Sequence, residues 1–159
     1  MALTDAVSVQ VHGLAELERA LMQLPEAVAG KALRSALYAG TASIKKEAAS
    51  LIPTGSTAHY VGRKKKGRLA QPGNLRKGLR IVRMRTGKYS AQYAITFSKL
   101  AFYGVFHEFG TNKMPAHPIL RPAFDNKKEQ ALERIKEMLA ANIERQRKKL
   151  FEESLRAGR

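Results

Sequence analysis

Three side chains in the second half of the chain are of the types that bind metals or transfer protons: His107, Glu108 and His117. Their spacing matches no helical zinc motif such as H-E-x-x-H, in which the two histidines lie one turn of helix apart. On a β-strand, His107 and Glu108 would point to opposite faces. We therefore do not expect a metal site here, and we interpret Glu108 as a structural carboxylate that pairs with an arginine, either Arg121 or Arg76.

Other signatures of catalysis are missing from the sequence. There is no G-x-S-x-G elbow, the 13 acidic residues form no obvious catalytic pair, and no glycine-rich phosphate loop leads from a strand into a helix. The chain has no cysteine, which excludes disulfides and a thiol nucleophile. No apolar run reaches the roughly 20 residues that span a bilayer, and the first residues do not resemble a signal peptide. We expect a protein that is not an enzyme, uses no cofactor or metal, has no membrane partner and is made in the cytoplasm.

The formal net charge of +16 is concentrated in one part of the chain. Residues 48–107 contain 12 Lys or Arg and no Asp or Glu, whereas the other 99 residues carry 17 basic and 13 acidic groups. A region of one charge sign attracts polyanions.

The densest basic run lies in the segment 56–74, which has no periodic apolar face and is expected to be a mobile loop. Its basic residues are Arg63, Lys64, Lys65, Lys66 and Arg68. These side chains are candidate nucleic-acid contacts that neutralise phosphates without reading the base sequence. A solvated surface loop with no binding role is the alternative interpretation.

The apolar pattern predicts one α+β domain over residues 1–159. A short strand is expected over residues 7–11, helices over 14–24 and 26–51, and strands over 79–85 and 89–98 with a turn at Thr86, Gly87 and Lys88. The second helix is expected to carry Leu33, Leu37, Ile44, Ala48 and Leu51 on one face.

Residues 102–109 fit either a strand or a helix, and we expect their aromatic side chains to lie in the core or in a subunit interface. These are Phe102, Tyr103, Phe106 and Phe109. A helix of roughly 30 residues should follow Pro122, longer than the typical helix of a globular protein. Residues 146–159 are expected to form a flexible extension beyond the domain.

Four short motifs follow one another along the chain: I-P-T-G at residues 52–55, G-N-L-R-K-G-L at 73–79, an aromatic segment ending in E-F-G-T at 103–111, and P-A-H-P-I-L-R-P-A at 115–123. In type and order they resemble the small neck or tail-completion proteins of long-tailed phages, related to the minor tail protein Z type. The resemblance covers residues 8–145. The gap between Gly55 and Leu75 is longer than in the shortest members of that family, and the basic loop fills it, so the resemblance assigns the loop no role.

The resemblance implies a structural virion protein at the head–tail junction or tail end of a siphovirus-like phage. It implies a ring-forming α+β subunit, in which two N-terminal helices and one long C-terminal helix flank a small antiparallel sheet. The ring would contain six or twelve copies, joined to head-completion or connector proteins and to tail-tube proteins, with phage double-stranded DNA in its bore. The motif residues expected to shape the subunit and its interfaces are Arg76, Glu108, Phe109, Gly110, Thr111, Pro118, Arg121 and Pro122.

Physical reasons support several of these motif residues. Gly110 permits a sharp turn after the aromatic segment, and Pro122 suits the first turn of a helix, where a missing N–H costs nothing. Glu108 and Arg121 lie on either side of the loop between them, so a bidentate ion pair would clamp it or bridge two subunits. The charge alone supports the alternative of a freestanding, sequence-nonspecific nucleic-acid-binding protein.

Overall fold

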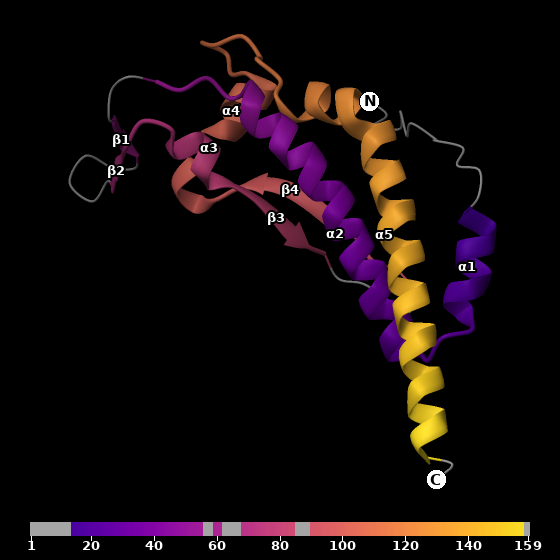
Figure 1. Cartoon of the computed structure of the whole chain (residues 1–159). Helices are drawn as coiled ribbons and strands as arrows, with labels where there is room; N and C mark the ends of the chain where they lie inside the picture. The colour runs from indigo at the N-terminus through magenta and orange to yellow at the C-terminus, as the bar shows by residue number, and fades with distance from the viewer. Residues whose placement is uncertain (1–13, 56–58, 62–67, 85–89, 158–159) are drawn as a thin grey trace.

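A computed structural model of the chain describes residues 14–55, 59–61, 68–84 and 90–157 (Figure 1). It has an α+β fold, as predicted. The elements, in chain order, are α1 (Leu14–Met22), α2 (Glu26–Leu51), β1 (His59–Val61), β2 (Arg68–Ala70), α3 (Asn74–Gly78), β3 (Leu79–Arg83), β4 (Tyr93–Phe97), the 3-10 helix η1 (Lys99–Ala101), α4 (Gly104–Phe109) and α5 (Leu120–Ala157).

Helices α2 and α5 lie side by side and form the long axis of the molecule, with α1 beside α5 and the β3–β4 sheet beside α2 (Figure 1). The start of α5 packs on the end of α2, and the second half of α5 packs on the first half of α2, so the two helices are antiparallel. Arg147 on α5 donates a 2.7 Å hydrogen bond to Gln23, which follows α1.

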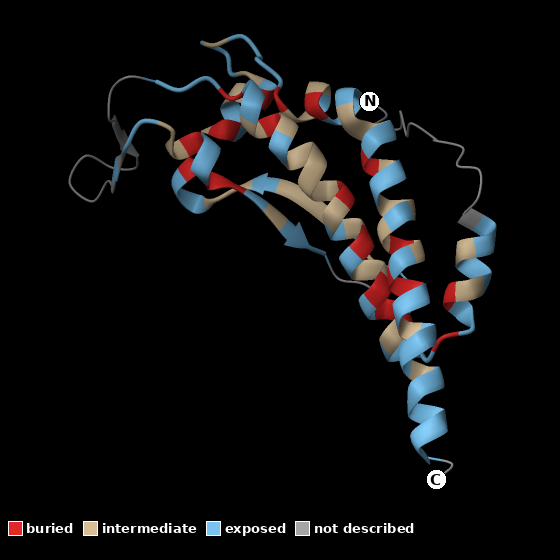
Figure 2. Cartoon of the chain, viewed as in Figure 1, coloured by how far each residue is buried: buried red, intermediate tan, exposed pale blue. Residues whose placement is uncertain are grey.

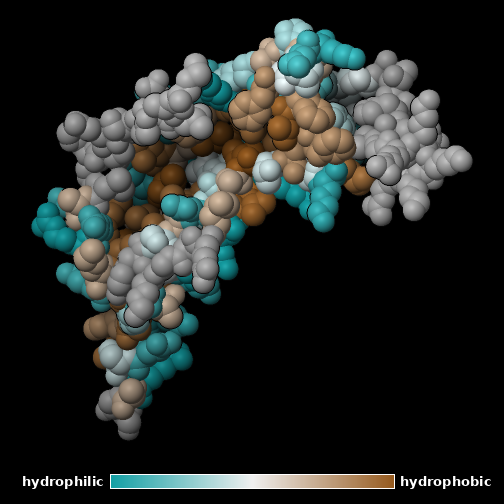
Figure 3. Space-filling view, turned by 180° about the vertical axis from the view of Figure 1, so that it is seen from behind, coloured by the Kyte–Doolittle hydropathy of each residue, from teal (hydrophilic) through white to brown (hydrophobic). Residues whose placement is uncertain are grey.

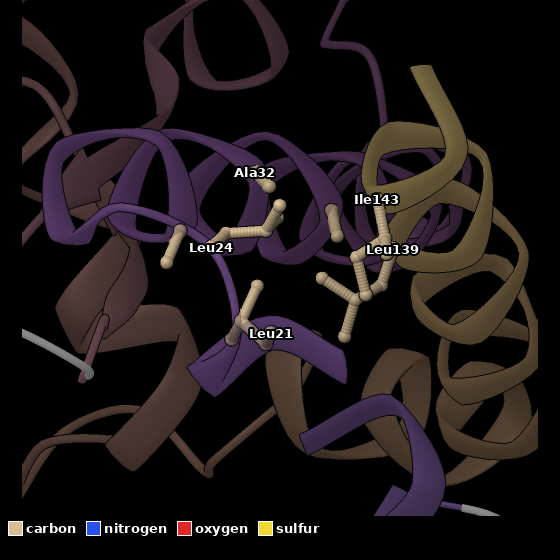
Figure 4. Packing of buried hydrophobic residues seen from close by; sticks show 7 residues of the cluster. Leu21, Leu24, Ala32, Leu139 and Ile143 are labelled. Carbon is tan, nitrogen blue, oxygen red and sulfur yellow. The ribbon is translucent and has the colours of Figure 1, made fainter. Parts of the chain in front are cut away.

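The buried residues form two separate clusters along this axis (Figure 2). The stem cluster joins α1, α2 and α5; its buried residues are Leu21, Leu24, Ala29, Ala32, Ala36, Leu139 and Ile143, several of which are shown in Figure 4. The corner cluster joins the end of α2 to the sheet, α3, η1 and the start of α5; its buried residues are Ala48, Ile52, Leu75, Leu79, Ala101, Ile119 and Ala123. We call the two parts of the molecule the stem and the corner.

Small residues, and not the leucines, occupy the buried positions of α2. Leu33, Leu37 and Ile44 are only partly buried, and Leu51 is exposed. The buried residues of α2 are Ala29, Gly30, Ala32, Ala36, Gly40 and Ala48. The reason is the close approach of α5: a Cβ atom added to Gly40 would lie 2.8 Å from the carbonyl oxygen of Ala131.

The β3–β4 sheet is antiparallel, with Leu79 opposite Phe97 and Arg83 opposite Tyr93. Both strands are shorter than predicted, and the expected turn at residues 86–88 lies outside the described residues. Side chains alternate between the two faces: Leu79 is almost completely buried in the corner cluster, whereas the next residue, Arg80, is exposed.

Strands β1 and β2 pair antiparallel, with His59 opposite Ala70, inside the segment 56–74 that we expected to be a loop. Strands of three residues are too short to show a period in the sequence, which explains why they were not predicted. The strand expected over residues 7–11 lies outside the described residues, as do Arg63, Lys64, Lys65 and Lys66.

In the segment 102–109, for which the sequence fits either a strand or a helix, residues Gly104–Phe109 form the helix α4. The last helix, α5, has 38 residues and continues to Ala157, so the extension expected from residue 146 is helical as far as the structure describes it. None of the helices in the described part of the chain combines the length and hydropathy needed to cross a membrane.

Candidate interaction site at the corner

The side chain of Glu108 caps the N-terminus of α5. Its Oε2 atom accepts hydrogen bonds from the backbone N–H groups of Ile119 at 2.7 Å and Leu120 at 2.9 Å. Its Oε1 atom accepts from the N–H groups of Leu120 at 3.2 Å and Arg121 at 3.3 Å. The carboxylate is buried at 9% exposure and lies at the end of the helix where the dipole favours negative charge.

This cap accounts for the free backbone groups of the first turn of α5. The first N–H groups of a helix have no partner within the helix. Here the N–H groups of residues 119–121 bind Glu108, Pro122 has no N–H, and the N–H of Ala123 binds the carbonyl of Ile119 at 3.2 Å. Each of these residues therefore has its donor satisfied or absent.

The predicted ion pair between Glu108 and an arginine is wrong. Among the described residues, neither Arg121 nor Arg76 forms an ion pair with Glu108. Arg121 offers its backbone N–H while its side chain is exposed, and Arg76 Nη2 donates to the carbonyl of Ile52 at 3.1 Å. Three converging N–H groups supply the positive potential that we had assigned to a guanidinium. The carboxylate still joins the two sides of the loop.

Gly110 turns the chain between α4 and the loop that leads to α5. It has φ +72° and ψ −178°, a conformation restricted almost entirely to glycine. A Cβ atom here would lie 2.8 Å from the backbone nitrogen of Ala116. The loop is further held by paired backbone hydrogen bonds between Thr111 and Met114, of 2.8 and 3.2 Å.

His107 and His117 lie close together but show no sign of a metal site. The N–H of His117 donates to the carbonyl of His107 at 2.7 Å, and both line a hollow of about 530 Å³ together with Pro53 and Pro118. Within the described residues, no three metal-binding side chains come together.

An exposed apolar surface covers η1 and α4. We call it the aromatic patch, and it consists of Leu100, Phe102, Val105, Phe106 and Phe109. The side chains are 40–46% exposed except for Phe109, at 79%. Phe102 packs edge-to-face on Phe106, with ring centroids 5.8 Å apart. Seen from behind, brown and tan residues reach the surface in this part of the molecule (Figure 3).

Only part of the aromatic cluster expected in the core or an interface lies in the core: Tyr103 packs against the corner cluster, whereas the Phe side chains are exposed. Once α4 is known to be a helix, the spacing of its residues shows which side chains are exposed. In α4, Val105, Phe106 and Phe109 are on the outer side, and Gly104 and Glu108 face inward.

Several basic residues of α3, β3 and η1 are exposed. Arg76 and Lys77 on α3, Arg80 and Arg83 on β3, and Lys99 at the start of η1 are all exposed. Of the five proposed nucleic-acid contacts, only the backbone of Arg68 is described, as the first residue of β2. Comparisons with family models, with curated proteins and with solved structures gave no match.

Proposed function

We propose that the protein is a structural subunit of a phage virion, which closes a homo-oligomeric ring at the head–tail junction or tail end. The observation that carries this proposal is the aromatic patch, where five large apolar side chains within ten residues are exposed on one subunit. Contiguous apolar surface of this kind marks a binding face in a small protein. The sequence motifs at the corner support the same assignment.

The thin core is a second argument for assembly. Seven of the 15 buried apolar residues in the described part of the chain are alanines, and only Ile52 and Leu79 are large and fully buried. A single subunit therefore buries little large apolar surface, and contacts between subunits would add to its stability as they do in obligate oligomers. The mechanism is scaffolding: complementary faces close the ring, and its two ends bind neighbouring connector and tail proteins.

Deletion of the gene from the phage genome that encodes it tests this function. We expect DNA-filled heads and separate tails in electron micrographs, because the joining layer is missing, and we expect the wild-type gene supplied in trans to restore joined particles. Normal joined virions from the deletion strain would contradict the proposal.

A freestanding nucleic-acid-binding protein is the second candidate, favoured by the 12 basic and no acidic residues in positions 48–107. Fluorescence anisotropy with a DNA duplex, measured over a range of salt concentrations, tests it. Replacing Arg63, Lys64, Lys65, Lys66 and Arg68 by Gln should lower the affinity and the salt slope together, because fewer counterions are released. The matched control replaces five exposed basic residues of α5, namely Arg134, Arg145, Lys148, Lys149 and Arg156. Equal losses in both variants would remove the loop's specific role.

A further inference from the structure

The outer side of α5 carries a stripe that changes from acidic to apolar along the helix. Its members are Glu133, Glu137, Glu144, Phe151 and Leu155, and all five are exposed. They are separated by 4, 7, 7 and 4 residues, so they lie on one face of the helix. We call this set the α5 stripe. At a rise of 1.5 Å per residue it is about 33 Å long.

The end of α5 that carries the apolar part of the stripe projects from the rest of the molecule. The last turns of α5 extend past the ends of α1 and α2 (Figure 1), and every residue from 151 to 157 is exposed. Phe151 is 64% and Leu155 59% exposed. A helix gains most of its stability from packing an apolar face, and the described residues of this chain provide no such packing for these two side chains.

The aromatic patch has the complementary pattern, with apolar residues next to basic ones. A 2.8 Å hydrogen bond from the Ser98 N–H to the Gly78 carbonyl holds the end of β4 beside the end of α3. Lys77 and Lys99 are the neighbours of these two residues, and Lys99 directly precedes Leu100 of the patch. Both lysines are exposed, and no acidic residue occurs between positions 48 and 107.

We propose that the α5 stripe of one copy docks on the aromatic patch of a second copy of this chain. Phe151 and Leu155 would cover the patch, and Glu144 and Glu137 would lie over the basic residues beside it. Glu133 and Glu137 make ion pairs within α5, at 2.8 Å to Lys136 and 3.9 Å to Arg134. Both carboxylates are exposed, so these pairs are exchanged at little cost. This proposal rests on the proposed ring and assigns its interface.

The positions of the two surfaces determine the kind of assembly. The stripe ends at the C-terminal end of α5 and the patch lies on α4, at the opposite end of the molecule (Figure 1). The contact therefore joins two different surfaces, which leaves a free stripe at one end of every pair and a free patch at the other. Heterologous contacts of this kind generate rings when the rotation closes.

Two variants, each lacking one surface, test the proposal. The stripe variant carries Phe151→Ser and Leu155→Ser, and the patch variant carries Phe106→Ser and Phe109→Ser; circular dichroism melting verifies that each is folded. In sedimentation equilibrium we expect the wild-type chain to associate beyond a dimer and each variant to associate at least 10-fold more weakly, since each loses two apolar contacts of about 1 kcal/mol or more. An equimolar mixture of the variants should form a 1:1 dimer and nothing larger, because one intact stripe meets one intact patch.

Three results would overturn the interface: a wild-type chain that stays monomeric at every concentration, a variant with wild-type association, or a mixture that stays monomeric. Phe109→Arg replaces the patch variant if the double substitution unfolds, because Phe109 is 79% exposed and has the least packing to lose.

Charge reversal gives an independent test. Glu137→Lys with Glu144→Lys should weaken association of the full chain, and more strongly at about 0.05 M than at about 0.5 M salt, because salt screens exposed charges. The control is Glu153→Lys, a reversal off the stripe at a residue paired with Lys149 at 3.7 Å. Equal weakening by the control would contradict the interface.

The failure of the interface and the failure of the proposed function are distinguishable in the deletion strain. If the wild-type gene and the stripe variant restore joined virions equally well, the ring role stands and this interface is wrong. If deletion leaves virions intact, the virion role is wrong, whatever the purified chain does.

Discussion

The stem and the corner are stabilised by different means, although the same two helices run through both. In the stem, small side chains on α2 let α5 approach closely, and the packing of Leu139 and Ile143 fills the remaining space. In the corner, a buried carboxylate collects four hydrogen bonds from the backbone of the next helix, and a glycine turns the chain. Stem stability should therefore depend on side-chain volume, and corner stability on backbone groups.

The largest effect is expected in the stem from Leu139→Ala. The side chain is 4% exposed and lies in the stem cluster, so its removal leaves a cavity between α2 and α5. We expect a loss of about 2–5 kcal/mol in the free energy of unfolding, measured by urea denaturation. The control, Leu155→Ala on the same helix, removes the same atoms from a site 59% exposed and should change the stability of the monomer by no more than about 0.5 kcal/mol. Similar losses at both positions would contradict the role of the stem cluster.

In the corner, Gly110→Ala should be the most damaging small substitution. Alanine disfavours the backbone conformation at φ +72°, and its Cβ atom would meet the nitrogen of Ala116 and the carbonyl oxygen of Met114 within about 3 Å. We expect a cost of at least roughly 1–3 kcal/mol in urea denaturation. Gly55→Ala is the matched control, because no atom lies within 4 Å of a Cβ at that position. A neutral Gly110→Ala would show that the corner does not depend on this turn.

Substitutions of Glu108 separate its hydrogen bonds from its charge. Glu108→Ala leaves the N–H groups of Ile119, Leu120 and Arg121 without their acceptor, and a loss of about 2 kcal/mol is expected. Glu108→Gln keeps one acceptor oxygen but removes the charge at the helix end, so about 1 kcal/mol should be lost. Urea denaturation measures both, and amide hydrogen exchange should show faster exchange at the start of α5 than in the stem.

The partly exposed Glu47 provides the control for this series, since its carboxylate accepts one 3.4 Å hydrogen bond, from Asn126, in place of the four that Glu108 accepts. Glu47→Gln should change stability by no more than about 0.5 kcal/mol. If Glu108→Ala and Glu47→Gln had equal effects, the cap would have no part in holding the corner.

The same contrast separates what could be predicted from the sequence from what could not. Helical periodicity and Pro25 predicted α1 and α2 well, because local spacing alone defines an amphipathic helix. The spacing did not identify the small residues that are buried on α2, because it does not show how closely a second helix approaches. The large apolar residues and the alanines of α2 both recur at helical spacing. Which of the two sets is buried depends on the position of α5.

In the corner, the sequence identified Glu108 as a fastening residue but not its partner. Carboxylates commonly pair with arginines, whereas the donors here are backbone N–H groups, which every residue except proline carries and no motif marks. Knowing that α5 begins at Leu120 would have supplied the missing signal: three free N–H groups next to Pro122 require an acceptor. Strands β1 and β2 were not predicted because three residues are too few to show an alternating pattern.

The smallest effect on stability is expected at the projecting end of α5, where an exposed residue and a packed residue are adjacent in the sequence. Phe151→Ser changes a side chain that is 64% exposed, so the free energy of unfolding should change by no more than about 0.5 kcal/mol. The adjacent Leu150 packs against the stem cluster, and Leu150→Ser should cost more, about 1–2 kcal/mol, because apolar surface returns to water. If Phe151 contributes nothing to folding while the adjacent Leu150 does, Phe151 behaves as a residue whose contact lies in another molecule. A large loss of stability from Phe151→Ser in the monomer would instead place its partner within its own chain, and the stem would then extend to the end of α5.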